Sequence, residues 1–201
     1  MTGGPWPVYL LRHGETEWNL LGRYQGGFDS PLTDRGREQA RAMGEQLAGL
    51  LPNTAVFRLI SSPLERAVAT ATIVAERLGL PFTRDARLRE ISLGSWDGLS
   101  RAEIAERFPT AIQGATRYDW YFRAPDGESV EAATLRLDAW LGSLTGPTIA
   151  VTHGLASRIL RGLYMGLDRA AALSLPVPQE GLFQLAGGIA TYLPGSAGSS
   201  S

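Results

Sequence analysis

The sequence predicts an α/β fold, a three-layer α/β/α sandwich in which helices cover both faces of a mostly parallel central sheet. Short apolar runs rich in β-branched residues alternate with stretches whose apolar residues recur at helical spacing. Two apolar runs are each followed, after one polar residue, by His-Gly, at His13 and His153, which is typical of side chains at the carboxyl ends of strands. The chain of 201 residues is about the size of one domain, and we expect residues 1–194 to form it.

Five short apolar segments are the predicted strands. They span residues 8–11, 56–60, 148–152, 182–185 and 189–193. The first is expected to be fully buried, because apolar residues fill it without alternation. The last two are separated by Gly187-Gly188 and predict a closing hairpin or a pair of edge strands.

Five segments with helical spacing are the predicted helices. They span residues 33–50, 62–78, 100–108, 128–144 and 155–165. The second has Ser62 as the expected N-cap, Pro63 at the first helical position and Glu65 three residues after the cap, and it stops at Gly79. A similar capping pattern opens the third, which ends before Pro109.

Composition narrows the classes of function. A formal net charge of −1 argues against a nucleic acid or an anionic membrane as the partner. The chain has no cysteine, which excludes disulfides, zinc–thiolate sites and cysteine nucleophiles. All 19 basic residues are arginine, whose planar fork matches a phosphate. No apolar run approaches the roughly 18 residues of a membrane helix, so we expect a cytoplasmic protein, with a disordered Gly/Ser-rich tail at 195–201.

The first candidate site is Arg12-His13-Gly14, where a cation and an imidazole follow a predicted strand and a glycine lets the backbone approach a ligand. Three further donors to an anion follow in one short segment: Asn19, Arg23 and Gly26. The alternative is a partly exposed histidine, with Arg12 paired to Glu15 or Glu17. The three donors that follow in the sequence favour an anion site.

Arg66 occupies the first turn of a predicted helix, where a cation opposes the helix dipole. Backbone amides also point outward there, which makes the position suitable for a bound anion. The alternative is a surface arginine paired with Glu65 or Asp85.

Glu90 lies between the apolar residues Leu88 and Ile91, beside Arg89 and ahead of Gly94 and Gly98. A partly buried carboxyl group near a cleft can hold a proton and deliver it to a leaving group. The residues alone favour the alternative, in which Glu90 pairs with Arg87 or Arg89.

The second imidazole, His153 in Thr152-His153-Gly154, stands at the base of a predicted helix. A packed histidine bonded to the backbone is the alternative. Because the chain has only two histidines and their contexts match, we expect a functional role for both.

In this order, the segments resemble the histidine phosphatase superfamily, also called the phosphoglycerate mutase-like family. The resemblance spans residues 10–163 and rests on four blocks: Arg12-His13-Gly14, Ser62-Pro63-Leu64-Glu65-Arg66-Ala67, Leu88-Arg89-Glu90 and Thr152-His153-Gly154. It implies that the fold is phosphoglycerate mutase-like.

The resemblance also implies a role for each block. His13 matches the family's nucleophile and Glu90 its proton donor, and His153 is implied to act beside them. The positions that hold the phosphoryl group are Arg12, Asn19, Arg66 and His153. The positions that contact the substrate are Arg23, Gln25 and Gly26.

The chemistry of these residues agrees with that assignment. An imidazole that attacks phosphorus needs the equatorial oxygens held in place, which two arginine forks and a second imidazole provide. No Walker loop, DxD cluster or metal-ligand spacing appears. We therefore expect a metal-independent, histidine acid phosphatase-like phosphomonoesterase that needs no cofactor and acts on a small-molecule phosphomonoester.

Within the family, the resemblance favours the phosphatase branch. Similar mutases carry a long insertion rich in Lys and Arg after the Glu block, and here that region is short and lacks lysine. A phosphoglycerate mutase-type phosphoryl transferase and a non-catalytic phosphate-ligand binding module remain the alternatives. Residues 179–183 lack the Asn often seen before the last strand of relatives, which leaves the far wall of the pocket undefined.

The aromatic segment 113–127 has two interpretations. Its rings, including Trp120 and Tyr121, could stack on a substrate ring or form a small satellite core, and we favour the core. The sequence leaves the physiological substrate and the oligomeric state open.

Overall fold

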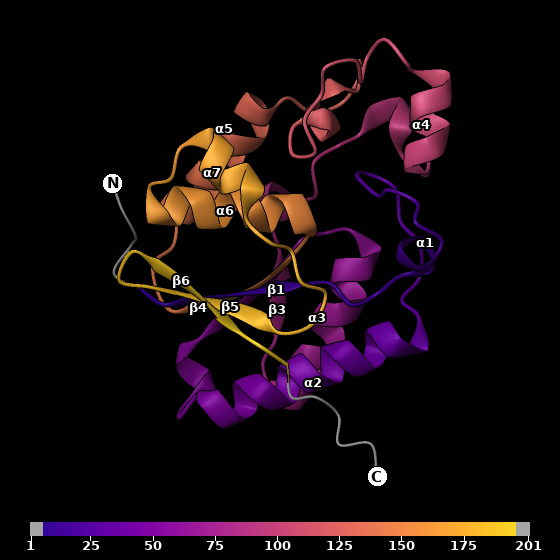
Figure 1. Cartoon of the computed structure of the whole chain (residues 1–201). Coiled ribbons are helices and arrows are strands. Elements are labelled where there is room, and N and C mark those ends of the chain that lie inside the picture. Colours follow the sequence, from indigo (N-terminus) through magenta and orange to yellow (C-terminus); the bar gives the residue numbers. More distant parts are fainter. Residues whose placement is uncertain (1–5, 196–201) are drawn as a thin grey trace.

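A six-stranded sheet runs through the centre of the molecule and carries helices on both faces (Figure 1). This computed structural model describes residues 6–195. The strands are β1 (Val8–Arg12), β2 (Arg58–Ser61), β3 (Phe82–Arg84), β4 (Thr148–Thr152), β5 (Leu182–Ala186) and β6 (Ile189–Leu193). The α-helices are α1 (Glu17–Leu20), α2 (Asp34–Leu50), α3 (Glu65–Leu78), α4 (Arg101–Arg107), α5 (Val130–Gly142), α6 (Gly154–Met165) and α7 (Arg169–Ser174).

The strand order is β3-β2-β4-β1-β5-β6. Pairing is parallel from β3 to β1, whereas β5 is antiparallel to both of its neighbours. The predicted α/β class with a mostly parallel sheet is confirmed. The single domain over 1–194 stays a prediction, and the tail predicted at 195–201 lies outside the described residues except for Gly195.

Strand β1 shows how the sheet builds two cores. Val8 and Leu10 pack into the layer of α5, α6 and α7, whereas Tyr9 and Leu11 pack toward α2 and α3. Figure 1 shows α5, α6 and α7 above the sheet and α2 below it. Successive side chains of a strand point to opposite faces, so burial on both sides explains the unbroken apolar run in the sequence.

The predicted start of the helix at Ser62 is wrong. Helix α3 begins at Glu65 with Leu64 in the N-cap position, and no side chain of that residue caps it. The start is delayed because Leu64 is extended, with φ −69° and ψ 137°, so residues 63 and 64 do not form a helical turn. The hydroxyl oxygen of Ser62 instead accepts the backbone N–H of Leu64 at 3.3 Å.

Other differences concern short elements. The strand predicted at 56–60 begins at Arg58, because residues Thr54–Val56 form a 3-10 turn. Strand β3 and helices α1 and α7 were not expected; they contain 3, 4 and 6 residues, too few for a periodic pattern.

The aromatic segment 113–127 forms part of a small separate core. Trp120 is 2% exposed and lies nearly parallel to the buried ring of Trp96, with ring centroids 6.1 Å apart. Leu93, Ile104 and Ala124 complete the buried cluster. This agrees with the interpretation of the segment as a satellite core.

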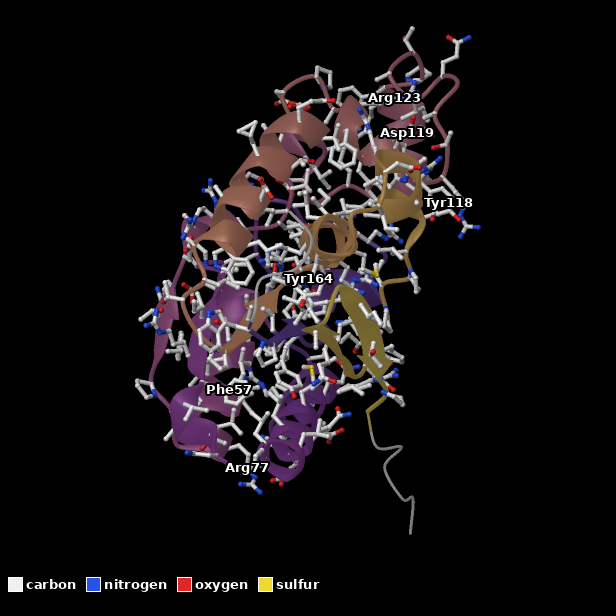
Figure 2. The ribbon with its side chains drawn as sticks, turned by 90° about the vertical axis from the view of Figure 1, so that its left-hand side faces the viewer. Phe57, Arg77, Tyr118, Asp119, Arg123 and Tyr164 are labelled. Carbon is white, nitrogen blue, oxygen red and sulfur yellow. The ribbon has the colours of Figure 1, made fainter. Side chains whose placement is uncertain are left out.

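Figure 2 locates this segment at one end of the molecule. Tyr118, Asp119 and Arg123 lie at the end opposite Arg77, and Tyr164 lies in the interior. Arg123 forms an ion pair with Asp119 at 3.2 Å, which joins one turn of the segment. Among residues 6–195, no helix has both the length and the apolar character needed to cross a membrane.

Candidate active site

The two histidines stand side by side because neighbouring strands end together. In the parallel pairing of β1 and β4, Arg12 lies opposite Thr152, so the next residue of each strand is a histidine. The backbone N–H of His13 donates to the carbonyl of Thr152 at 3.0 Å. The two imidazole centroids are 5.2 Å apart.

The proton of His13 is held on Nδ1. This nitrogen lies 2.8 Å from the carbonyl oxygen of Gly14, which can only accept, so Nδ1–H donates and Nε2 keeps a free lone pair. Gly14 must be a glycine, because a Cβ there would lie 2.1 Å from the carbonyl oxygen of Gly36. Gln179 adds a hydrogen bond from Nε2 to the His13 carbonyl at 2.8 Å.

His153 lies deeper than His13 and is fully buried. Its Nε2 is 2.7 Å from the hydroxyl oxygen of Ser62, and its Nδ1 has no partner among the described residues. Burial, followed by the positive charge of Arg66, lowers the pKa of both His13 and His153 well below the usual value. Both rings are therefore neutral at neutral pH.

Two arginines supply positive charge beside the imidazoles. Arg12 is half-buried; its Nη1 donates to the carbonyl of Val177 at 3.0 Å, and burial lowers its pKa. Arg66 is 1% exposed and donates from Nη1 to the carbonyl of Phe28 at 2.7 Å. It also forms an ion pair at 2.7 Å with Asp29, rather than with the predicted alternatives Glu65 or Asp85.

Several buried polar atoms here lack a protein partner. Within the part of the chain that the structure describes, they include Nε of Arg12, Nε of Arg66 and Nδ1 of His153. Buried polar atoms without partners are rare in native proteins, because each carries a desolvation cost, and the two guanidinium nitrogens of this set can only donate. An anion with several acceptor oxygens fits this set of atoms.

A pocket of about 260 Å³ opens above His13. Its lining includes Arg12, His13, Asn19, Arg23, Gln25, Glu90, Tyr121, Arg158 and Val177. Arg66 and His153 do not belong to that lining and lie in the buried layer next to His13. Three cations of the lining face one carboxylate, so the pocket suits an anionic ligand. Within residues 6–195, no three His, Asp or Glu side chains gather as metal ligands would.

Glu90 is held by the amino end of helix α6. Its carboxylate accepts the backbone N–H groups of Leu155 at 3.1 Å and Ala156 at 3.0 Å, and also that of Ile91 at 3.0 Å. The alternative partner Arg87 forms its ion pair with Asp85 at 2.6 Å instead. The carboxylate is thus fixed at the wall of the pocket by the backbone.

Over residues 8–186 the chain matches the family model of the histidine phosphatase superfamily, branch 1. The chain belongs to this superfamily. The resemblance seen in the four sequence blocks is thereby confirmed.

Relatives within the superfamily include both mutases and phosphatases by name. The probable phosphoglycerate mutase GpmB of Salmonella arizonae is 37% identical over 168 residues, which are 80% of this chain and 75% of that protein. The glucosyl-3-phosphoglycerate phosphatase of Mycolicibacterium vanbaalenii is 37% identical over 182 residues, 85% of this chain and 75% of that protein. The native structure of the mycobacterial glucosyl-3-phosphoglycerate phosphatase has a TM-score of 0.77 at 32% identity and covers 89% of both chains.

Three of the remaining predicted site residues line the pocket: Asn19, Arg23 and Gln25. Asn19 lines the pocket; its Oδ1 accepts the backbone N–H of Thr16 at 3.2 Å, which leaves Nδ2 as the donor for a ligand. Arg23 also lines it, and pairs with Glu103 at 3.2 Å. Gln25 reaches the same wall and donates to the hydroxyl of Thr16.

Gly26 lies beside the pocket rather than in its lining. Its carbonyl accepts from Arg66 at 3.0 Å, and its N–H donates to the carboxylate of Asp97. A Cβ at position 26 would lie 2.6 Å from the carbonyl oxygen of Ile91, so only glycine fits at this position. The carbonyl of Gly26 therefore helps to hold the guanidinium of Arg66 in place.

Sequence reasoning missed three residues of the site: Arg158, Asp29 and Ser62. For Tyr121, which lines the pocket, it favoured packing in the satellite core over contact with a substrate. Arg158 follows Gly154, which also lines the pocket, by four residues of α6, a spacing that places both on one face of the helix. Val177, which accepts from Arg12, lines the pocket on the side that residues 179–183 left undefined, and Gln179 donates to the His13 carbonyl without belonging to the lining. Nothing local in the sequence marks Asp29, which reaches Arg66 across 37 residues.

Proposed function

We propose that this protein hydrolyses phosphomonoesters through a phosphohistidine formed on His13, with Glu90 as the proton donor. The observation that carries the proposal is the hydrogen bond from Nδ1–H of His13 to the carbonyl of Gly14, 2.8 Å long, which leaves Nε2 free to attack phosphorus. The buried atoms without partners on Arg12, Arg66 and His153 support it, since phosphoryl oxygens would satisfy them.

In the first step, Nε2 of His13 attacks phosphorus in line with the ester oxygen. The N–P bond forms as the P–O bond to the leaving group breaks. A protonated Glu90 gives its proton to the leaving oxygen, and the alcohol departs. The proton on Nδ1 stays on the ring, held by the carbonyl of Gly14.

In the second step, water attacks the phosphorus of the phosphohistidine. Glu90, now a carboxylate, takes a proton from the water as the new O–P bond forms and the N–P bond breaks. Inorganic phosphate leaves, and both His13 and Glu90 return to their starting protonation states. One ester bond and one water are consumed in each cycle.

The phosphoryl oxygens are held by Arg12, Asn19, Arg66 and His153. Backbone bonds orient Arg12, Asn19 and Arg66 before the substrate arrives, and the Ser62 hydroxyl contacts His153, so their stabilisation of the transition state needs little reorganisation. The carbonyl of Val177 fixes Arg12 and that of Gly26 fixes Arg66. Because side chains supply this set of donors, we propose an activity that needs neither metal nor cofactor.

The substrate is proposed to be a small-molecule phosphomonoester. Arg23, Gln25, Tyr121 and Arg158 surround the space beyond the phosphate and would contact its alcohol part. The names of the two relatives, which concern phosphoglycerate and its glucosyl derivative, make phosphorylated sugar acids the first compounds to test.

A mutase activity is the second candidate, and the name of the Salmonella relative favours it. A mutase would move the phosphoryl group between carbon positions after priming by a bisphosphate. Release of inorganic phosphate and transfer to another hydroxyl can be separated by ³¹P NMR of one reaction. A non-catalytic phosphate-binding module, the third candidate, would turn over no ester.

The test is a screen of phosphomonoesters that measures released phosphate, with and without EDTA. We expect turnover of at least one ester, no loss on chelation, and no turnover by His13→Ala. His153→Ala should be severely impaired without being inactive. Equal activity of His13→Ala and the natural protein would end the proposal.

A further inference from the structure

We infer that Ser62 is a positioning residue that fixes the tautomer of His153. Its hydroxyl donates to Nε2 of His153, which keeps the ring proton on Nδ1, where it can bond a phosphoryl oxygen. The inference rests on the proposed function only in assigning a phosphoryl group as the ligand of that proton.

The contact lies in the driest part of the site. Ser62 and His153 are both 0% exposed, and the hydroxyl oxygen is 2.7 Å from Nε2. The backbone N–H of Ser62 donates to the carbonyl of Val151 at 2.9 Å, which ties the end of β2 to β4 just before His153. Two strand ends therefore hold the hydroxyl and the imidazole in register.

The direction of this hydrogen bond follows from the other contacts of Ser62. Its oxygen already accepts the backbone N–H of Leu64 at 3.3 Å. The hydroxyl proton still needs an acceptor, and Nε2 of His153 is its partner in the described part of the chain. The reverse assignment, with Nε2–H donating to Ser62, would leave a buried hydroxyl proton unsatisfied.

The ring proton of His153 then lies on Nδ1, where it can donate to a bound anion. This nitrogen is buried and has no partner in the described part of the chain. With Nε2 accepting, the neutral ring must carry its proton on Nδ1. A lone pair in that place would repel a phosphoryl oxygen, so the tautomer decides whether His153 stabilises or opposes the bound anion.

Nitrogen NMR can observe this tautomer directly. The chain has only two histidines, so a sample labelled with ¹⁵N-histidine gives four ring nitrogens, assigned with one His153→Asn variant. We expect His153 as the neutral Nδ1–H form in the protein without ligand. Inorganic phosphate at saturating concentration should shift the His153 Nδ1–H resonance and leave its proton in place.

Three variants separate positioning from packing. Ser62→Ala should release His153 into a mixture of tautomers and lower kcat by about 10- to 100-fold, the range for loss of a hydrogen-bond partner that orients a functional histidine. Ser62→Thr keeps the hydroxyl and should restore the Nδ1–H form. Ser61→Ala is the matched control: Ser61 is equally buried, and its hydroxyl donates to the carbonyl of Ser62 at 2.8 Å without reaching the imidazole.

An Nε2–H tautomer of His153 in the natural protein would overturn the inference, and this measurement requires no variant to fold. Unchanged tautomer populations in a folded Ser62→Ala, or an equal fall of kcat in Ser61→Ala, would overturn it as well. Failure of the proposed function has a different result. In that case Ser62 would still control the tautomer, but no ester would be hydrolysed.

Discussion

Asp29 and Arg66 are joined by two hydrogen bonds. Oδ1 of Asp29 lies 2.7 Å from Nη1 of Arg66 and accepts the backbone N–H of the same residue at 3.3 Å. The other carboxylate oxygen accepts the backbone N–H of Glu65 at 2.9 Å. One carboxylate thus caps α3 and neutralises a buried guanidinium, which explains how a cation can occupy the first turn of a helix.

Replacing Asp29 by alanine should lower both stability and phosphate affinity. Loss of a helix cap costs about 0.5–2 kcal/mol, and leaving the buried Arg66 without its ion-pair partner costs more. We therefore expect the free energy of unfolding to fall by about 2 kcal/mol or more. Urea unfolding measures the first effect and phosphate titration the second.

Asp34→Ala is the control for this change, because Asp34 is an exposed acid in the first turn of α2. Its loss should change the free energy of unfolding by a few tenths of a kcal/mol. If Asp29→Ala behaves like this control, Asp29 does not hold Arg66.

The comparison of Ser62 and Asp29 shows what the sequence could predict. The motif around Ser62 has the spacing of a capping box, and local spacing correctly indicated a helix there. It could not indicate that Leu64 is extended, which delays the helix to Glu65, nor that the hydroxyl of Ser62 would contact His153. The cap comes from Asp29, whose position depends on how a distant loop folds back.

The same reasoning applies to the rest of the site. Strand ends and glycines are local features, so His13, Arg12 and His153 were predictable from patterns. The partner of Glu90 was not: the residues alone favoured Arg87 or Arg89, whereas backbone amides of α6 hold the carboxylate. Tertiary contacts decide such cases.

The buried histidines make stability depend on pH. Their pKa values in the folded protein lie well below the usual 6.5, so below that pH the unfolded chain binds protons that the folded chain does not. Stability should therefore fall as pH drops from about 6.5 to 5, by up to about 1.4 kcal/mol per pH unit for each histidine. Urea unfolding at several pH values measures this slope.

His13→Asn should remove about half of that slope, and saturating inorganic phosphate should reduce it by favouring protonated imidazoles in the folded state. Carboxylates with lowered pKa values, such as Asp85, change the stability mainly below pH 5, so they add little to the slope between pH 6.5 and 5. A flat profile between pH 6.5 and 5 would contradict the buried, neutral state of the two rings.

Trp120 and Tyr121 should respond differently to truncation. Trp120 is 2% exposed, and Trp120→Ala should lower the free energy of unfolding by about 3–5 kcal/mol, as for other buried aromatic residues.

Tyr121 is partly exposed and lines the pocket, so Tyr121→Ala should raise KM by about 2- to 10-fold, the value of one aromatic contact. Tyr121→Phe keeps the ring and should retain the natural KM. If KM is unchanged in Tyr121→Ala, this ring only packs.

Glu90 gives the sharpest test of the mechanism. A general acid contributes about 10²- to 10⁴-fold when the leaving group is poor. Glu90→Gln should therefore cripple hydrolysis of alkyl phosphates, whereas nitrophenyl phosphate, whose leaving oxygen barely needs a proton, should still phosphorylate His13. Asp126→Asn is the matched control, because that carboxylate lies in the adjoining cavity and accepts from Ser95.

The second step should reveal the same carboxyl group acting as a base. Without it, attack by water is slow, so Glu90→Gln should show a burst of nitrophenol followed by slow turnover, with acid-labile phosphohistidine accumulating on His13. Rapid-quench kinetics and ³¹P NMR measure both. The amide that Glu90→Gln introduces would face backbone N–H groups of α6, so a thermal melt must first show that the variant is folded. If both substrates slow equally and no phosphoenzyme builds up in a folded variant, Glu90 is structural.

The other acids near the pocket have partners of their own: Asp97 accepts from Gly27 at 2.9 Å, and Glu128 pairs with Arg136 at 2.6 Å. A proton donor taken from that pair would first have to leave its partner.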